Sequence, residues 1–416
     1  MPYLSTRAFT SSLIGSIRYW EVNKVMVELF EKAEQCCGCT ACLNICPKQA
    51  ISMLEDQKGF LYPKIDGSRC VECGLCQKVC PFKVDGLAGG KFSKTAYAVK
   101  NKDNTERAQS SSGAVFIEVA KAVLGSDGVV YGVRLDDVHR AMHDRASSIE
   151  SARKFQGSKY VQSYKGSIFQ EVKRDLKAGN TVLFTGTPCE VAGLKRYLGA
   201  PYDNLVTVDI ICHGTPSPGS FDDHIRALEK KYSSKISKIS FRNKQYGWRN
   251  QELWIKFNNG EIYHNPIWED EYYRLFTGNY LLRDSCYLCP FASMNRPGDI
   301  TIGDFWNINN VKPDFEDKLG VSSIIVNTEK GQDLIAEILP SFEYFEVSLD
   351  ECTQRNLQAP SPKPDDFNSF RADWEQHGLD YCRKKYASMG FGERIRRTLS
   401  PVKKRVIKIV KRGVRE

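Results

Sequence analysis

Apolar and polar positions follow two patterns along this chain, one typical of strands and one typical of helices. The alternation of these patterns predicts the secondary structure. Short apolar runs, typical of buried strands, stand at residues 97–100, 128–133, 181–184 and 205–212. Segments with apolar positions three and four residues apart, typical of helices, follow them at residues 112–124, 167–177, 189–198 and 221–232. The alternation predicts an α/β core with a largely parallel sheet.

Two further patterns extend this prediction. Residues 50–53 and 60–65 are short strand-like runs ahead of the core, and a hairpin over 252–264 is expected to turn at Asn258-Asn259-Gly260. We therefore expect an α/β fold, α+β overall, in five parts. These are an N-terminal extension (1–32), a cysteine-rich module (33–83), the α/β core (95–345), a C-terminal helical segment (346–392) and a basic tail (393–416).

Eight cysteines in the module repeat one spacing, C-x-x-C-x-x-C-x-x-x-C-P. Three cysteines at three-residue intervals can wrap one iron-sulfur cube, while the fourth, just before a proline, reaches the other cube. The spacing therefore predicts two [4Fe-4S] clusters with interlaced ligands, Cys36, Cys39, Cys42 and Cys80 for the first cluster and Cys70, Cys73, Cys76 and Cys46 for the second. Paired zinc knuckles and a disulfide framework fit this spacing less well. Cys37 is left over, and we interpret it as a small packed thiol.

The net charge of +9 lies entirely in the last 23 residues, from Arg394 onward, so the rest of the chain is electrically balanced. A basic groove for nucleic acid is therefore not expected. In the tail, apolar positions at helical spacing are flanked by basic ones, which suits an anionic membrane surface, a solvated tail or a helix docked on a partner.

The number of cysteines and the length of the apolar runs indicate in which cellular compartment the protein is expected. No apolar run reaches the roughly 18 to 20 residues of a membrane span. Fifteen cysteines with cluster spacing need a reducing compartment, so we expect a cytoplasmic protein, with the tail as a contact to the inner membrane surface. Met26 stands shortly before the first cysteine loop, so residues 1–25 are interpreted as an optional extension.

Two helix starts in the core suit a phosphate-bearing cofactor. Ser110 to Gly113 and Thr185 to Pro188 offer backbone N–H groups, hydroxyls and the positive end of a helix dipole, although such residues are also ordinary helix caps. Clusters pass single electrons, whereas most metabolites exchange two, so a chain with clusters and a second large domain usually needs a flavin.

Several thiols and one histidine are candidates for further chemistry. Cys189 is expected in the first turn of a helix, Cys212 and His213 end a strand, and Cys286 and Cys289 form a lone C-x-x-C. The four cysteines could ligate a further metal centre, act as redox or acid thiols near a flavin, or pack as small buried residues. His213 is the best general acid or base of the core on chemistry alone.

Residues from about 33 to 310 resemble the coenzyme F420 hydrogenase/dehydrogenase beta-subunit family, in its bacterial form with an N-terminal two-cluster module. The resemblance rests on the two cysteine loops and on stretches such as FTGTPCEVAGL from Phe184 to Leu194 and DIICHGTPS from Asp209 to Ser217. It implies FAD bound by three segments, through Ser111, Ser112, Gly113, Gly157, Ser158, Lys159, Tyr160, Gln162, Gly186, Thr187 and Pro188.

Three positions depart from the family pattern. Ala114 stands where a second glycine is common, Glu190 where glutamine is common, and Asn307 where glycine is common. The flavin contacts are therefore expected to differ locally from those of the family.

Together these features predict an iron-sulfur flavoprotein oxidoreductase. It would exchange electrons between a ferredoxin-type carrier and a small organic substrate beside Cys189, Cys212 and His213. Many bacterial members of the family accompany polysaccharide biosynthesis genes, which suggests that setting. Two alternatives stay open: a deazaflavin (coenzyme F420)-dependent hydrogenase/dehydrogenase beta subunit with that deazaflavin as its carrier, and a non-catalytic electron-transfer protein.

Overall fold

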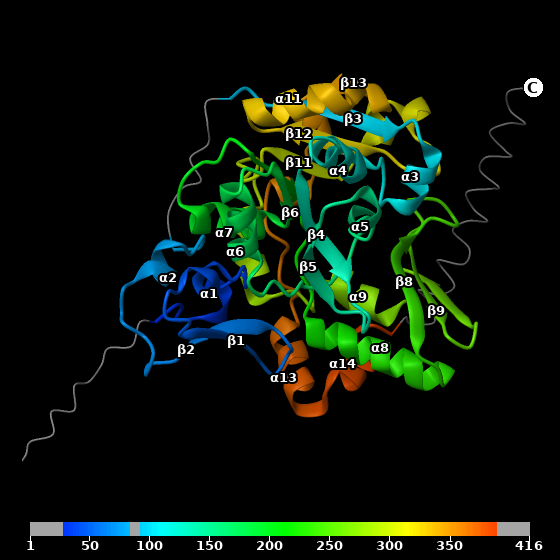
Figure 1. Cartoon of the computed structure of the whole chain (residues 1–416). Coiled ribbons are helices and arrows are strands. Elements are labelled where there is room, and N and C mark those ends of the chain that lie inside the picture. The colour runs from blue at the N-terminus through cyan, green and yellow to red at the C-terminus, as the bar shows by residue number, and fades with distance from the viewer. Residues whose placement is uncertain (1–27, 84–91, 389–416) are drawn as a thin grey trace, which may run out of the picture.

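The computed structural model describes residues 28–83 and 92–388, drawn in colour in Figure 1. The expected basic tail, residues 393–416, and most of the N-terminal extension lie outside these residues. In the described part, no helix is long and apolar enough to cross a membrane.

The cysteine module contains two short helices and one hairpin. Strands β1 (Ile51–Glu55) and β2 (Leu61–Ile65) pair antiparallel, which confirms the two strands expected there. Helices α1 (Ala41–Ile45) and α2 (Leu75–Lys78) each begin within a cysteine loop, after a residue in the left-handed conformation: Thr40 (φ 67°) before α1 and Gly74 (φ 70°) before α2. The two loops therefore share a backbone path as well as a spacing.

An eight-stranded mixed sheet forms the centre of the core, in the order β13-β3-β12-β11-β7-β6-β4-β5. The strands are β3 (Thr95–Asn101), β4 (Val129–Leu135), β5 (Ala141–Ala146), β6 (Val182–Gly186), β7 (Leu205–Ile210), β11 (Ile300–Asp304), β12 (Ser322–Val326) and β13 (Phe342–Val347).

The expectation of a largely parallel sheet is wrong. In this sheet the neighbours β11, β7, β6 and β4 run parallel, and the other four pairings are antiparallel. Five residues join β4 to β5, which is too short for the crossover that parallel strands require.

Helices cover both faces of this sheet. Alternate residues of β6 point to opposite sides: Leu183 packs with α4 (Val115–Gly125) and α11 (Glu329–Ile338), whereas Val182 and Phe184 pack with α6 (Ile168–Lys177) and α7 (Pro188–Leu198). The group of apolar side chains around Val182 and Phe184 also contains Cys37, Cys39 and Ala41 of the cysteine module. The cysteine module thus docks against α6 and α7, as Figure 1 shows.

A further apolar group of side chains surrounds a three-stranded sheet in the order β10-β9-β8. Its elements are α8 (Pro218–Tyr232), β8 (Ile236–Asn243), β9 (Glu252–Phe257), β10 (Ile262–Pro266), α9 (Glu271–Thr277), α13 (Phe367–His377) and α14 (Leu379–Tyr386). The remaining α-helices are α3 (Asn104–Gln109), α5 (Ile149–Arg153), α10 (Ile308–Val311) and α12 (Leu349–Cys352).

Each strand and helix expected in the core has a counterpart in the structure. The helix expected from Ser112 begins later, at Val115, because Ala114 adopts the left-handed conformation with φ 65°. Glycine adopts this conformation without strain, which explains why a glycine is common at this position in the resembling family.

Candidate functional site

The first cysteine loop is buried between the module and α7. Cys39 is 7% exposed, and a Cβ atom on Gly193 of α7 would lie 2.8 Å from its sulfur. Burial raises the pKa of the Cys42 thiol well above its usual value, and the charges of Cys39, Cys36 and Cys80 act in the same direction. The four cysteines predicted for the first cluster therefore lie close together.

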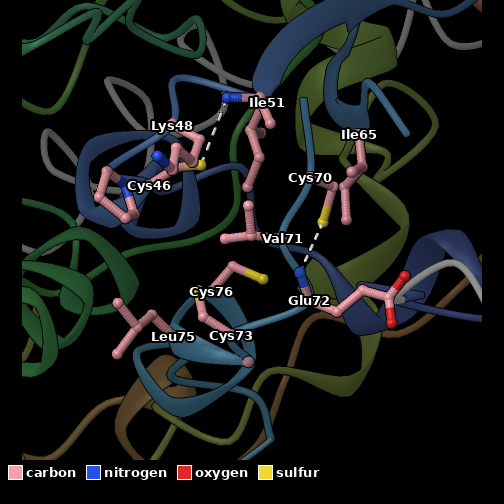
Figure 2. A pocket seen from close by; sticks show the side chains of 13 residues that line it. Cys46, Lys48, Ile51, Ile65, Cys70, Val71, Glu72, Cys73, Leu75 and Cys76 are labelled. Atoms are coloured by element: carbon pink, nitrogen blue, oxygen red, sulfur yellow. Dashed lines mark hydrogen bonds between the residues drawn. The ribbon is translucent and has the colours of Figure 1, made fainter. Parts of the chain in front are cut away.

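The second cysteine loop surrounds a more open pocket of about 370 Å³. Its wall includes Cys46, Cys70, Cys73 and Cys76, which Figure 2 shows together with the apolar side chains between them. Cys73 is exposed, and the neighbouring Val71 is 55% exposed. The structure thus places Cys46, from the first repeat, beside the three cysteines of the second.

A second pocket, of about 510 Å³, gathers the cysteines of the core. Cys189, Cys212, Cys286 and Cys289 line it, and we call it the four-cysteine pocket. They come from the first turn of α7, the segment after β7 and the short helix Asp284–Leu288 with its C-cap residue. Burial raises the pKa of Cys289 to about 12, with Cys189 and Cys286 acting in the same direction. All four are free cysteines.

His213 also lines the four-cysteine pocket. Burial lowers its pKa, so the imidazole is neutral at pH 7. Within the described chain its Nε2 atom is buried without a hydrogen-bond partner. A neutral ring with a free nitrogen can take a proton from a bound molecule or give one to it.

Cys37 connects the first cysteine loop to this pocket. Sequence reasoning assigned this thiol only a packing role, and it is indeed buried, at 7% exposure. It lies on the wall of the four-cysteine pocket, and hydrogen bonds with Cys189 and then Cys39, together with burial, raise its pKa. One side chain therefore touches both a predicted cluster ligand and the pocket.

The structure brings the three segments expected to bind FAD next to one another. The hydroxyls of Ser111 and Ser158 lie 2.8 Å apart, which joins the first segment to the second. Ser163, which ends the second segment (Gly157 to Ser163), donates to Glu190 Oε1 at 3.3 Å, and Glu190 directly follows the third segment (Gly186 to Cys189). Pro188 in turn lines the four-cysteine pocket.

Several of the expected flavin residues are occupied by contacts within the protein. Lys159 donates to the carbonyl oxygens of Lys154, Phe155 and Gln156, and burial lowers its pKa to about 7. Gln162 donates to the Cys37 carbonyl at 3.1 Å. The hydroxyl of Ser322 meets the Ser112 hydroxyl and the Gly113 N–H, both at 2.8 Å.

Gly186 ends β6, and Thr187 is the N-cap of α7, where Glu190 closes a capping box with it. A Cβ on Gly186 would lie 2.9 Å from Glu190 Oε2. Glu190 is also paired with Lys165 at 2.7 Å, and although burial opposes its charge, Lys165 holds its pKa at about 2. This ion pair accounts for the glutamate at a position where the resembling family often has glutamine.

Arg242 is a candidate site residue that the sequence reasoning missed. Its Nη1 donates to Asp304 Oδ2 at 2.5 Å, while Nε and Nη2 are buried without a partner in the described chain. The nearby Lys244 donates to the Ser112 carbonyl at 3.2 Å, which places this basic pair beside the first flavin segment. The only signal in the sequence was the stretch from Phe241 to Trp248, which belongs to the family resemblance.

Two family models match the chain. Residues 35–84 match the 4Fe-4S dicluster domain, and residues 179–348 match the C terminus of the coenzyme F420 hydrogenase/dehydrogenase beta subunit. Residues 179–348 belong to the coenzyme F420 hydrogenase/dehydrogenase beta-subunit family. The dicluster module precedes this beta-subunit domain in the chain.

Curated relatives match shorter stretches. A polyferredoxin-like protein of Methanocaldococcus jannaschii is 30% identical over 87 residues, which cover 19% of this chain and 47% of the relative. An epoxyqueuosine reductase of Bacillus cereus is 40% identical over 63 residues, covering 12% and 17%. A ferredoxin of M. jannaschii is 34% identical over 55 residues, covering 13% and 70%. The chain thus spans less than half the length of the first two relatives.

Among solved structures, a chain of the F420-reducing [NiFe] hydrogenase complex from Methanosarcina barkeri is similar, with 15% identity and a TM-score of 0.43. The alignment covers 73% of this chain and 94% of that one. At this level of similarity no functional conclusion follows from the match.

Proposed function

We propose that the protein is an iron-sulfur flavoprotein oxidoreductase in which the second cysteine loop, the first cysteine loop and the four-cysteine pocket lie in series. The contact of Cys37 with both Cys39 and Cys189 carries this proposal, because it joins the module to the core at the pocket that contains His213. The exposed loop would receive an electron carrier, and the pocket would receive a small organic substrate.

The donor sets of the two loops fit [4Fe-4S] clusters. Four thiols around each site are the ligands such clusters take, with Cys36, Cys39, Cys42 and Cys80 holding the first and Cys46, Cys70, Cys73 and Cys76 the second. When bound, the clusters supply single-electron transfer and the flavin supplies exchange of electron pairs.

The flavin proposal rests on Arg242. A buried guanidinium with unpartnered N–H groups is costly, and a phosphate oxygen is the group that would satisfy it best. Tyr160 lies within electrostatic reach of Arg242, and Ser111 contacts Ser158 at 2.8 Å, so we expect these residues and Gly157 to line the same ligand. Lys159, Gln162, Ser112, Gly113, Gly186 and Thr187 would act by holding these segments in place.

In the pocket, His213 would move the proton that accompanies electron transfer, since its Nε2 is free. Cys189 and Cys212 would contact the substrate beside it. The setting in polysaccharide biosynthesis rests on the family resemblance alone.

The convergence of Cys286 and Cys289 on Cys189 and Cys212 favours a second role for the same pocket. Four free thiols from three parts of the chain would supply the ligands of a third cluster. In that case Cys189 and Cys212 would be ligands, and His213 would be the remaining acid or base.

Anaerobic purification tests both proposals. We expect about eight iron and eight labile sulfides per chain for the two loops, or about twelve of each with a third cluster that Cys289→Ser removes. Extracted flavin should identify FAD, and Arg242→Leu should weaken its binding. Tightly bound zinc without charge-transfer absorption would contradict the cluster assignment, and protein that stays colourless with excess FAD after cluster removal would contradict the flavin.

A further inference from the structure

Arg283 is completely buried and holds its guanidinium against the first cysteine loop. Its Nε donates to the Cys36 carbonyl at 2.7 Å, and its Nη2 lies 3.6 Å from the Cys36 sulfur. The same Nη2 donates to the Leu61 carbonyl at 3.0 Å. The positive charge is thus in hydrogen-bond contact with a predicted cluster ligand.

The surroundings fix this guanidinium in place. Its Nη1 donates to Gln162 Oε1 at 3.0 Å, and the Tyr62 ring lies 3.9 Å from its central carbon. Gly38 leaves room for it, because a Cβ there would lie 3.1 Å from that carbon and 2.8 Å from Gln162 Nε2. A side chain with so many specific contacts has one position.

The charge of Arg283 needs a counterion, because a buried cation without one is strongly unfavourable. The adjacent carboxylate, Asp284, is paired instead with Arg371 at 3.1 Å. The nearest anionic group is then the thiolate of Cys36, as it would be in a bound cluster. One-electron reduction adds a negative charge to a cluster, so a cation and an N–H donor at a ligand sulfur stabilise the reduced form.

The second loop has a different arrangement. Its sulfurs accept from backbone N–H groups, Cys46 from Ala50 at 3.3 Å and Cys70 from Glu72 at 3.4 Å (Figure 2). The side chains of Lys48 and Glu72, of opposite charge, both lie on the wall of its pocket, which opens to solvent. The charged side chains of Lys48, Arg69 and Glu72 around the second set of ligands are all exposed, whereas Arg283 is buried against the first set.

We propose that Arg283 raises the reduction potential of the cluster in the first loop above that of the cluster in the second, so that an electron entering the protein settles on the buried side. This inference rests on the proposed cluster ligands, and it assigns Arg283 and Gln162 as positioning residues that tune one cluster of the two.

The test is a potentiometric titration of the full-length, cluster-loaded protein followed by low-temperature EPR. Signals are assigned with Cys42→Ser, which removes the first cluster, and Cys73→Ser, which removes the second. Arg283→Met should lower the ratio of reduced to oxidised first cluster at a fixed potential by at least about tenfold, equal to 59 mV for one electron. The second cluster should titrate as in the wild type. Arg69→Met, which removes an exposed charge next to Cys70, is the matched control and should shift neither cluster comparably.

Gln162→Glu keeps Arg283 and partly neutralises it, so the first cluster should again become harder to reduce. Unchanged potentials in iron-replete Arg283→Met overturn the proposal. If Arg283→Met loses iron, the Gln162→Glu variant decides between the two roles. A lowered reduction potential of the first cluster in Gln162→Glu supports the proposal. An unchanged potential, or loss of the first cluster, would mean that Arg283 has a structural role only. Absence of iron from the wild type would instead contradict the cluster ligands themselves.

Discussion

The first cysteine loop is buried under α7 and faces the guanidinium of Arg283, whereas the second opens to solvent at Val71 and Cys73. Both loops have the same cysteine spacing and similar backbone conformations at matching positions. The difference lies in what the rest of the chain places around them. Ligand spacing thus determines which residues can hold a cluster, and tertiary packing determines how exposed and how charged its surroundings are.

The residues between the cysteines differ between the two loops in line with this difference in surroundings. Gly38 and Glu72 occupy the same position, each with a positive φ (70° and 54°), but Gly38 lies against Arg283 and Gln162 whereas Glu72 is exposed. Cys37 and Val71 also occupy the same position, and one is 7% exposed while the other is 55% exposed. Exchanging residues between the repeats is therefore a direct way to test the comparison.

The largest effect is expected from Gly38→Glu, which gives the first loop the residue of the second. The new side chain would overlap Arg283 and Gln162, so the first cluster should be lost and iron should fall from about eight to about four per chain. Iron analysis and EPR measure this. Glu72→Gly, the reverse exchange, should leave the iron unchanged and alter stability by only about 1 kcal/mol. Equal iron loss in the two variants would contradict the comparison.

Removal of iron by a chelator should distinguish the loops next. Because Cys73 is exposed and Cys39 is buried, the second cluster should be lost several times faster than the first. Loss is followed by the decay of each EPR signal under anaerobic conditions. Loss of the first cluster at the same rate would show that the loop opens readily in spite of its packing.

Cys37→Val, which again copies the second loop, should have a smaller effect. Both clusters should remain, since Cys37 lies outside the proposed ligand set, but reduction of the bound flavin through the module should slow. Stopped-flow spectroscopy measures the flavin reduction rate, and Val71→Ala is the control at the matching position. An unchanged rate would leave Cys37 with a packing role only.

The smallest effect concerns acid stability on the buried side. Against the effect of burial, Lys165 holds the pKa of Glu190 at about 2, below its ordinary value of 4.5, so the ion pair stabilises the fold above pH 4.5 and this contribution is lost as pH falls toward 2. Cluster-free wild-type protein should therefore lose about 1 kcal/mol between pH 4.5 and 3.5 that Glu190→Gln does not lose. Thermal melting at several pH values measures the difference, and parallel curves would argue against the ion pair.

Much of the local structure could be predicted from the sequence. Apolar runs and helical spacing located the strands and helices of the core, because these patterns act over a few residues. The start of α7 followed from Thr187 and Pro188, whose capping preferences are local. The sheet was predicted less well, since strand direction depends on connections, as the short link between β4 and β5 shows.

The residues of the candidate site also fall into those that local sequence patterns predicted and those that they did not. The cysteine repeats were visible because all eight residues lie within 45 positions of one another. Arg283 was not, because it lies 247 residues from the carbonyl it contacts, and neither spacing nor composition relates the two. Arg242 and the role of Cys37 were missed for the same reason: their partners become neighbours only in the folded chain.

The contact between Gly193 and Cys39 also has a consequence for the biogenesis of the protein. A helix without a side chain at that point closes directly over the sulfur of a proposed ligand, so we expect the first cluster to be delivered before the module docks on the core. The second cluster can be delivered, or replaced after damage, in the finished protein. Labelled iron supplied to folded, cluster-free protein should therefore enter the second loop first, and repair would be confined to the side that faces the carrier.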